Sequence, residues 1–443
     1  EASKFTNFET LRLNGALDVS LLSGITAIEL SGAANNISKL SAPQAGSVTA
    51  TADIGATTIA LANSSGTSDA LTLIMGDGKG AAFDAGTLTI NGFETLNVTA
   101  NPLATSADKE TVIASFNADK LTAINLTGSS VDLRNAATTK AVTIDGSALT
   151  GTLKVAGNLA TGSTVNAGAG KDTLALGAVG ATYSGGTGDD GFTATAVTQL
   201  ENGGVFNTLD GGAGTDTLTV TANAVTLVDS HFSKMSNMEK IIVDADGGTG
   251  AVSFTTGGFY NSIFAAGGSE VTLLGADTDV ITFTGNTFTG DQKVTVTSLG
   301  LGNAAGEDIS VTTGSGSDTV TVTAATWTGT AGASSNITIS TGAGVDTISL
   351  TTGDLAATTT GVISIDAGAG ADIITVAGDN GTTDTAVIRF DISDGDSTAA
   401  GRDKITGFER ADGTDRSDVL SFDLATVATN TGGGMNGADA GTI

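Results

Sequence analysis

The sequence predicts an all-β fold, a right-handed parallel β-solenoid or β-roll. Two patterns lead to this prediction: short runs in which apolar and β-branched residues alternate with polar ones, and glycine-rich turns that recur between the runs. The chain has 63 Gly and 2 Pro among 443 residues, which suits many short strands joined by tight turns. Hydrophobic residues make up 40% of the chain, enough to bury a core. We therefore expect a folded protein with few long helices.

The charge of the chain restricts its partners. Its 18 basic and 47 acidic residues give a formal net charge of -29. Nucleic acid and anionic membranes are excluded as partners, because both are held by clustered Lys or Arg. No apolar run approaches the ~20 residues of a membrane span, so direct membrane insertion is not expected. The chain has no Cys, so a metal ion is the expected substitute for disulfide cross-links.

The first part of the chain, residues 1–165, has the strand rhythm of a solenoid with few metal sites. One short helix is predicted over residues 108–116, because acidic residues in its first turn suit a helix N-terminus. A repeated Phe/Met-Glu motif, at 7–13, 92–98 and 237–243, is interpreted as an edge strand that opens a new coil with Phe or Met packed inward. The predicted strands are 58–61, 71–74, 88–90, 96–98, 121–126, 142–144 and 153–155.

A second motif, Gly-x-Gly-x-Asp followed by a β-rich run, begins near residue 166. Its clearest copy is Asp210-Gly-Gly-Ala-Gly-Thr-Asp216-Thr-Leu218. Glycine lets the backbone turn sharply with its carbonyl oxygens inward, Asp adds a carboxylate, and the apolar residue two positions later anchors the next strand. One turn supplies part of the ~6–8 oxygens that Ca²⁺ prefers, and an identical turn stacked one coil away would complete the shell. A single copy is ordinary turn chemistry. Repetition of the motif favours calcium binding.

The spacing of the copies predicts which turns stack. Asp172 and Asp190 are 18 residues apart, whereas the other steps are 26 or 28 residues, which suits a broader coil with two or three strands. Two ladders follow, one through Asp172, Asp190 and Asp216 and one through Asp318, Asp346 and Asp372. A weaker copy around Asp277 and Asp279 is a candidate to begin the second ladder, and Asp394 or Asp396 to extend it. The predicted calcium ligands are Gly168, Gly170, Asp172, Gly186, Gly188, Asp190, Asp210, Gly212, Gly214, Asp216, Asp277, Asp279, Gly314, Gly316, Asp318, Gly342, Gly344, Asp346, Asp366, Gly368, Gly370, Asp372, Asp394 and Asp396.

The glycine-Asp copies resemble the nonapeptide repeats of RTX proteins. Together with the Phe-Glu-Thr-Leu motif and the segment Leu61-Ala-Asn-Ser-Ser-Gly-Thr-Ser-Asp69, they look like the crystalline region of Caulobacter-type surface-layer proteins. The resemblance implies type I secretion through an uncleaved C-terminal signal, folding outside the cell on binding calcium, and self-assembly at the cell surface. Several copies have Ala or Thr for the first Gly, and the 26–28 spacing departs from the tight roll of the family.

The motifs divide the chain into five expected regions. Residues 401–408 and 417–422 resemble the strand pair that closes an RTX block, so we interpret them as a cap. Because the chain begins and ends within its pattern, we expect a fragment of a longer polypeptide. The expected regions are the solenoid 1–165, a first calcium ladder 166–235, a connecting solenoid 236–310, a second ladder with its cap 311–425, and a Gly-rich linker 426–443.

An enzyme is not expected. His231 is the only histidine and is interpreted as a surface or turn residue, so a zinc site with two histidines is impossible. The segment around Lys171 departs from a phosphate loop, because Val165 stands at its first glycine position and Asp172 at its Ser/Thr position. Two functions remain open: a structural surface-layer protein, or an RTX adhesin, fibre or secretion-and-folding module of a larger type I secreted protein. The expected partner is a second copy of the chain, with cell-surface polysaccharide bound through regions outside this sequence.

Overall fold

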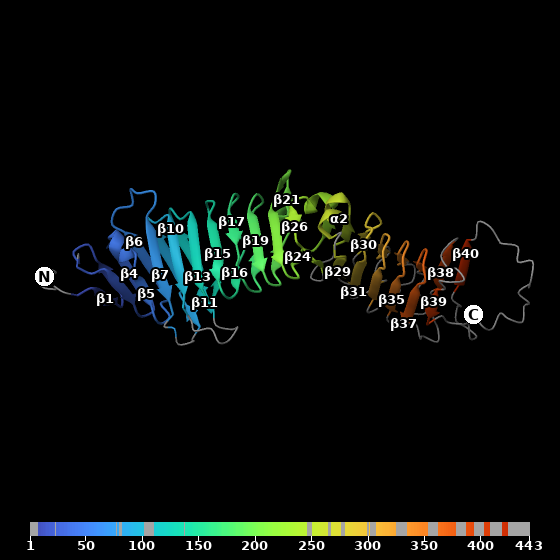
Figure 1. Cartoon of the computed structure of the whole chain (residues 1–443), viewed down its shortest axis with the longest axis horizontal. Coiled ribbons are helices and arrows are strands. Elements are labelled where there is room, and N and C mark those ends of the chain that lie inside the picture. The colour runs from blue at the N-terminus through green and yellow to red at the C-terminus, as the bar shows by residue number, and fades with distance from the viewer. Residues whose placement is uncertain are drawn as a thin grey trace, which may run out of the picture. The chain divides into compact units, whose positions relative to one another are not determined.

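The computed structural model describes residues 8–22, 24–76, 78, 82–101, 110–136, 138–245, 250–264, 267–275, 280–298, 301, 307–324, 335–352, 362–377, 387–393, 403–407 and 419–423. The chain divides into two compact units, residues 1–275 and 276–443. Both are parallel β-solenoids, as the sequence predicts, and Figure 1 shows the strands stacked as successive rungs within each unit. No helix in the described part of the chain is long and apolar enough to cross a membrane.

Unit 1 has three parallel sheets in its first rungs. The first sheet consists of β1 (Thr10–Leu13), β3 (Ala27–Leu30), β5 (Val48–Ala50), β7 (Ala70–Met75), β10 (Thr95–Ala100), β13 (Ala123–Gly128), β15 (Thr143–Leu149), β17 (Thr164–Asn166), β19 (Thr182–Thr187), β23 (Thr208–Ala213) and β26 (Met235–Ser236). The second contains β8 (Phe83–Asp84), β11 (Glu110–Ile113), β14 (Ser130–Leu133), β16 (Leu153–Val155), β18 (Thr173–Ala175), β20 (Gly191–Ala194), β24 (Thr217–Thr221), β27 (Lys240–Ala245) and β29 (Ser269–Gly275). The third consists of β2 (Ala16–Asp18), β4 (Ala34–Leu40), β6 (Ala56–Leu61), β9 (Thr87–Asn91) and β12 (Ser115–Ala118).

The third sheet ends at β12, and from β13 onward the rungs of unit 1 alternate between the first and second sheets. Near the end of the unit, short elements are added to this pattern. They are the parallel pair β25 (Val225–Leu227) and β28 (Val252–Thr255), the antiparallel hairpin of β21 (Glu201–Asn202) and β22 (Val205–Phe206), and the 3-10 helices η2 (Val197–Gln199) and η3 (Asp229–Phe232). The α-helices are α1 (Ala42–Ala45) and α2 (Gly258–Phe264).

Unit 2 has two strands in each rung. One sheet consists of β31 (Gln292–Ser298), β33 (Thr319–Ala324), β35 (Thr347–Thr352), β37 (Ile373–Ala377) and β39 (Lys404–Thr406). The other consists of β30 (Ile281–Thr284), β32 (Ile309–Thr312), β34 (Ile337–Ser340), β36 (Val362–Asp366), β38 (Val387–Ser393) and β40 (Val419–Asp423). The predicted cap corresponds to β39 and β40, which extend different sheets.

Alternate residues of each strand point into the core. In β33, Val320, Val322 and Ala324 are fully buried, while the threonines between them are partly exposed. This is the period-two pattern of a pleated strand with one face inward. Every strand predicted in residues 1–165 is confirmed, and so is the burial of the apolar residue two positions after each ladder aspartate. Those buried residues are Leu174, Phe192, Leu218, Val320, Ile348 and Ile374.

One local prediction is wrong, and a second is wrong at two of its three copies. Residues 108–116 do not form a helix where the structure describes them, since Glu110–Ile113 is strand β11 and Ser115 begins β12. The β-branched Thr111, Val112 and Ile113 fit a pleated strand between β8 and β14, which outweighs the helical signal of the preceding acids. Of the Phe/Met-Glu strands, β10 and β27 are not edge strands, because each has a neighbour on both sides, whereas β1, at the first copy, lies at the edge of its sheet among the described strands, as predicted. The predicted inward packing of the Phe or Met residue is confirmed for Phe93 and Met238 but is wrong for Phe8, which is 59% exposed.

Candidate metal centre

The aspartates of the first predicted ladder stack on successive rungs. The backbone N–H of Asp172 donates to Oδ1 of Asp190 at 2.7 Å, and the N–H of Asp190 donates to Oδ1 of Asp216 at 2.7 Å. All three side chains are at most 1% exposed. Each carboxylate therefore bonds to the rung before it, and the 18- and 26-residue spacings do place these residues in one ladder.

The second ladder in unit 2 has the same geometry. Asp318 N–H donates to Oδ1 of Asp346 and Asp346 N–H donates to Oδ1 of Asp372, both at 2.7 Å. These three side chains are also at most 1% exposed. The turns that precede them stack as well, through single parallel bridges that join Ser315 to Ala343 and Ala343 to Ala369.

The other carboxylate oxygen of the ladder residues is the feature that points to a cation. Oδ2 of Asp190 and of Asp216 is buried and has no hydrogen-bond partner. Oδ2 of Asp190 and the carbonyl oxygen of Gly211 lie 2.3 Å and 2.5 Å from the point that a Cβ on Gly185 would occupy. Both oxygens are acceptors and both border the same buried space beside Gly185, where a cation or a proton would be stabilised.

The same arrangement recurs one rung later. Oδ2 of Asp216 and the carbonyl oxygen of Asn237 lie 2.6 Å and 1.9 Å from the Cβ position of Gly211. In the second ladder, the hydroxyls of Thr313 and Thr341 donate to backbone carbonyl oxygens at 3.0 Å and 2.9 Å. Oδ2 of Asp318 and Oδ2 of Asp346 have no hydrogen-bond partner of their own, although the same hydroxyls lie near enough to lower the pKa of the two carboxyls in part.

Burial also raises the pKa of these carboxyls. It raises the pKa of Asp190 and of Asp346 to about 6, and the rise is opposed only in part, by backbone N–H donors and, at Asp346, also by the Thr341 hydroxyl. The pKa of Asp172, Asp216 and Asp318 is raised as well, again chiefly by burial. The physical cause is the loss of water around the charged form. A bound cation would favour that charged form and remove the penalty.

The glycines of the repeat allow the turns to approach closely. A Cβ on Gly344 would lie 1.6 Å from the carbonyl oxygen of Gly316, and one on Gly368 would lie 1.6 Å from that of Gly342. Gly344 also has a φ of 152°, which L side chains rarely adopt. The same close approach occurs at the predicted ligands Gly186, Gly188, Gly212, Gly214, Gly316, Gly342 and Gly370, and Gly168, Gly170 and Gly314 face neighbouring backbone carbonyls in the same way.

Several predicted ligands lie elsewhere. Asp210 is on β23, where its Oδ1 accepts from Asn237 Nδ2 at 2.6 Å and from Ser236 Oγ at 3.2 Å. Asp366 is the last residue of β36, and its Oδ1 accepts from the N–H of Gly368 at 3.1 Å. Asp277, Asp279, Asp394 and Asp396 lie outside the described residues.

The residues at the ends of the second ladder differ from those expected. Gln292, rather than Asp279, holds the position before Asp318, because its N–H donates to Oδ1 of Asp318 at 2.7 Å. Asp403, rather than Asp394 or Asp396, follows Asp372, whose N–H donates to Oδ1 of Asp403 at 3.0 Å. Neither position is preceded by a Gly-x-Gly turn, so the motif does not reveal them.

Two glutamates of the Phe/Met-Glu motif, which were not predicted as site residues, occupy positions structurally equivalent to those of the ladder aspartates. Asp216 N–H donates to Oε2 of Glu239 at 2.8 Å, and Asp69 N–H donates to Oε2 of Glu94 at 2.9 Å. Both glutamates directly precede a strand, as the ladder aspartates do. Their position directly before a strand could have identified them from the sequence. They were not identified because no Gly-x-Gly turn precedes either glutamate.

His231 lies in the 3-10 turn η3, as a turn histidine would, but it is buried rather than on the surface. Its Nδ1 accepts from the N–H of Val228 at 3.2 Å, and its Nε2 lies 3.9 Å from Oε2 of Glu201. Burial lowers its pKa.

The described residues contain no group of three or more Asp, Glu, His or Cys side chains placed to hold one metal ion. Each rung offers one buried carboxylate, so a cation would take its remaining ligands from turn carbonyl oxygens such as that of Gly211. Calcium accepts such oxygen-only, carbonyl-rich shells, whereas zinc prefers nitrogen and sulfur ligands. Comparisons with protein-family models, curated proteins and solved structures find no match to the chain.

Proposed function

We propose that the chain is a calcium-dependent structural protein of a bacterial surface layer, which is secreted, folds outside the cell and assembles with copies of itself. The observation that supports this most directly is at Asp190, whose buried Oδ2 has no hydrogen-bond partner and, like the carbonyl oxygen of Gly211, borders the space beside Gly185. The residues fit a hard cation with oxygen ligands. The proposal assigns no catalysis to the chain.

Calcium would supply the positive charge that the ladders need. The chain's own groups do the rest: the backbone N–H of each rung orients Oδ1 of the next aspartate, and the glycines bring the carbonyl oxygens close. A cation that binds the folded state alone adds RT ln(1 + [L]/Kd) to stability, about 2.7 kcal/mol per site at a hundredfold excess over Kd. With several sites, folding would depend on calcium.

Assembly follows from the same charge balance. A chain with a net charge of -29 repels its own copies until its carboxylates are neutralised. Sodium chloride screens this long-range repulsion, but it cannot provide the oxygen-coordinated ion that orders a turn.

The proposal is tested in two steps. Circular dichroism and melting in excess chelator, and after calcium is restored, measure the folding dependence; full β signal and an unchanged Tm in chelator would disprove it. Light scattering and electron microscopy then compare calcium, magnesium and sodium chloride at matched ionic strength. Ordered sheets or fibres in calcium alone support the surface-layer function, whereas a calcium-folded monomer would favour the adhesin or secretion-module alternative.

A further inference from the structure

The third sheet of unit 1 stops abruptly at β12. This strand pairs with β9 on one side, and no strand in the described part of the chain pairs with its other side. The first and second sheets meanwhile continue with β13 and β14. β12 therefore has one open edge among the described strands. The backbone N–H and C=O groups on that edge point away from β9.

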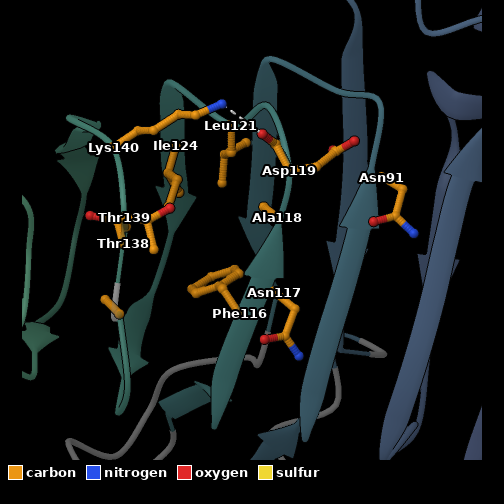
Figure 2. A pocket seen from close by; sticks show the side chains of 11 residues that line it. Asn91, Phe116, Asn117, Ala118, Asp119, Leu121, Ile124, Thr138, Thr139 and Lys140 are labelled. Carbon is orange, nitrogen blue, oxygen red and sulfur yellow. Dashed lines mark hydrogen bonds between the residues drawn. The ribbon is translucent and has the colours of Figure 1, made fainter.

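A cavity of about 370 Å³ lies along this edge. It is bounded by β12 and its adjoining residues and by residues 136 and 138–140, which follow β14 in the chain. Figure 2 shows the ring of Phe116 lying in the gap between β12 and the chain that carries Thr138 and Thr139. Small-molecule sites usually have volumes of about 300–1,000 Å³, so the cavity has the size of one.

Lys140 closes one end of the cavity. Its Nζ reaches across the gap and donates to the backbone carbonyl of Asp119 at 2.9 Å, as Figure 2 shows. Asp119 is itself fixed, because its Oδ1 accepts from the N–H of Gly92 at 2.8 Å. An extended peptide paired with β12 would have to pass the Lys140 side chain where it bonds to Asp119. This side chain therefore favours a compact ligand over an added strand.

The lining is amphipathic and balanced in charge. Phe116, Leu121 and Ile124 provide an apolar wall, while the hydroxyl of Thr139 and the amide of Asn117 also line the cavity. Its two charged residues, Lys140 and Asp119, have opposite signs. Amides and hydroxyls both donate and accept hydrogen bonds, as sugar hydroxyls do. An apolar wall beside such groups suits a pyranose ring, which has an apolar C–H face and a polar rim.

We propose that this cavity binds a neutral saccharide unit. The ring would lie against Phe116, with its hydroxyls toward Thr139 and the open edge of β12. The proposal does not depend on calcium binding, because the cavity lies apart from the aspartate ladders in the sequence and contains none of their residues. If the saccharide is part of a cell-surface polysaccharide, this cavity would let the chain bind the polysaccharide directly, without regions outside this sequence.

The test uses saturation-transfer NMR on the full chain with glucose, mannose and N-acetylglucosamine, and with the charged sugars glucuronate and glucosamine. We expect transfer to at least one neutral sugar and weaker transfer to the charged ones. Ala118→Phe, at an exposed position of the lining, should fill the cavity and raise Kd at least ~10-fold. Thr139→Phe fills it from the opposite wall. Ala56→Phe, at an exposed alanine in the same sheet that does not line the cavity, should leave binding unchanged.

Melting curves establish that each variant is folded, and a variant that unfolds is replaced by the other blocking variant. The proposal is overturned if no neutral sugar shows transfer, or if transfer persists equally in both folded blocking variants. A seven-residue Thr/Val peptide is titrated in parallel. Binding of the peptide alone, abolished by Ala118→Phe, would assign the edge to strand addition and overturn the saccharide proposal.

Discussion

The backbone N–H of Asp318 donates a 2.7 Å hydrogen bond to Oδ1 of Asp346, 28 residues later in the chain. Asp346 repeats this relationship with Asp372. Each carboxylate thus satisfies a buried backbone donor of the preceding rung, whether or not a cation is bound. The ladder therefore has two separable functions, one in the backbone hydrogen bonds through Oδ1 and one in charge compensation at Oδ2.

The first prediction concerns pH. Because the folded pKa of Asp190 and Asp346 is about 6, above the ordinary 3.8, the calcium-free folded state retains protons that the unfolded state releases. Stability without calcium should therefore be highest at low pH, fall as pH rises from about 4 to about 6, and level off above. Calcium should stabilise above about pH 6 and lose its effect below. Tm measured on calcium-stripped protein and with added calcium, from pH 4 to 8, checks both slopes, and a calcium-free Tm that rises over this window would contradict the prediction.

The second prediction separates the two functions of the carboxylate. Asp190→Asn keeps Oδ1 for the N–H of Asp172 and replaces the unpartnered Oδ2 with an uncharged NH₂ donor. It should stabilise the calcium-free protein at pH 7.5 by about 1 kcal/mol, because it removes a buried negative charge that has no partner at Oδ2. The calcium response should decrease. Asp145→Asn, at a partly exposed position on β15, is the matched control and should change neither quantity. Loss of stability in Asp190→Asn at this pH would argue against an uncompensated charge.

The third prediction concerns the interior and end of a ladder. Asp346 lies between the rungs of Asp318 and Asp372, whereas Asp172 is the first glycine-turn aspartate of its ladder. Asp346→Ala should disturb two ion shells and Asp172→Ala only one. Isothermal titration of calcium measures the number of ions lost, and an equal loss in the two variants would contradict the stacking order.

The fourth prediction isolates the close approach of the turns. Gly344 and Gly203 both have positive φ, but a Cβ on Gly344 would clash with the carbonyl of Gly316, whereas one on Gly203 has nothing within 4 Å. Gly203→Ala should cost about 1 kcal/mol for its backbone conformation alone. Gly344→Ala should cost about 3 kcal/mol or more. Urea denaturation in calcium compares the two, and similar costs would mean that the stacked turns relax easily.

The ladders could be predicted from the sequence because the spacing between successive aspartates equals the length of one coil. Asp172, Asp190 and Asp216 therefore recur at the same position in successive rungs. It could not predict Gln292 or Asp403 at the ladder ends, since the local signal was the glycine turn and neither residue follows one. The helix expected over 108–116 failed because pairing with β8 and β14 is a long-range effect that a local pattern does not contain. The end of the third sheet at β12, and the cavity beside it, depend on the same long-range pairing.

The last prediction tests whether the glutamates replace the ladder aspartates. Oε2 of Glu239 accepts the N–H of Asp216, and its longer side chain does this without a preceding glycine turn. Glu239→Ala leaves a buried N–H without its acceptor and should cost about 1–3 kcal/mol. Glu239→Gln keeps an oxygen acceptor, so it should retain most of that stability while losing one negative charge near Asp216. That charge helps to raise the pKa of Asp216, so the Gln variant should shift the calcium-free stability curve in this region toward lower pH. Urea denaturation of both variants, with and without calcium, measures these effects. If Ala and Gln destabilise equally, the hydrogen bond to Asp216 is not what Glu239 contributes.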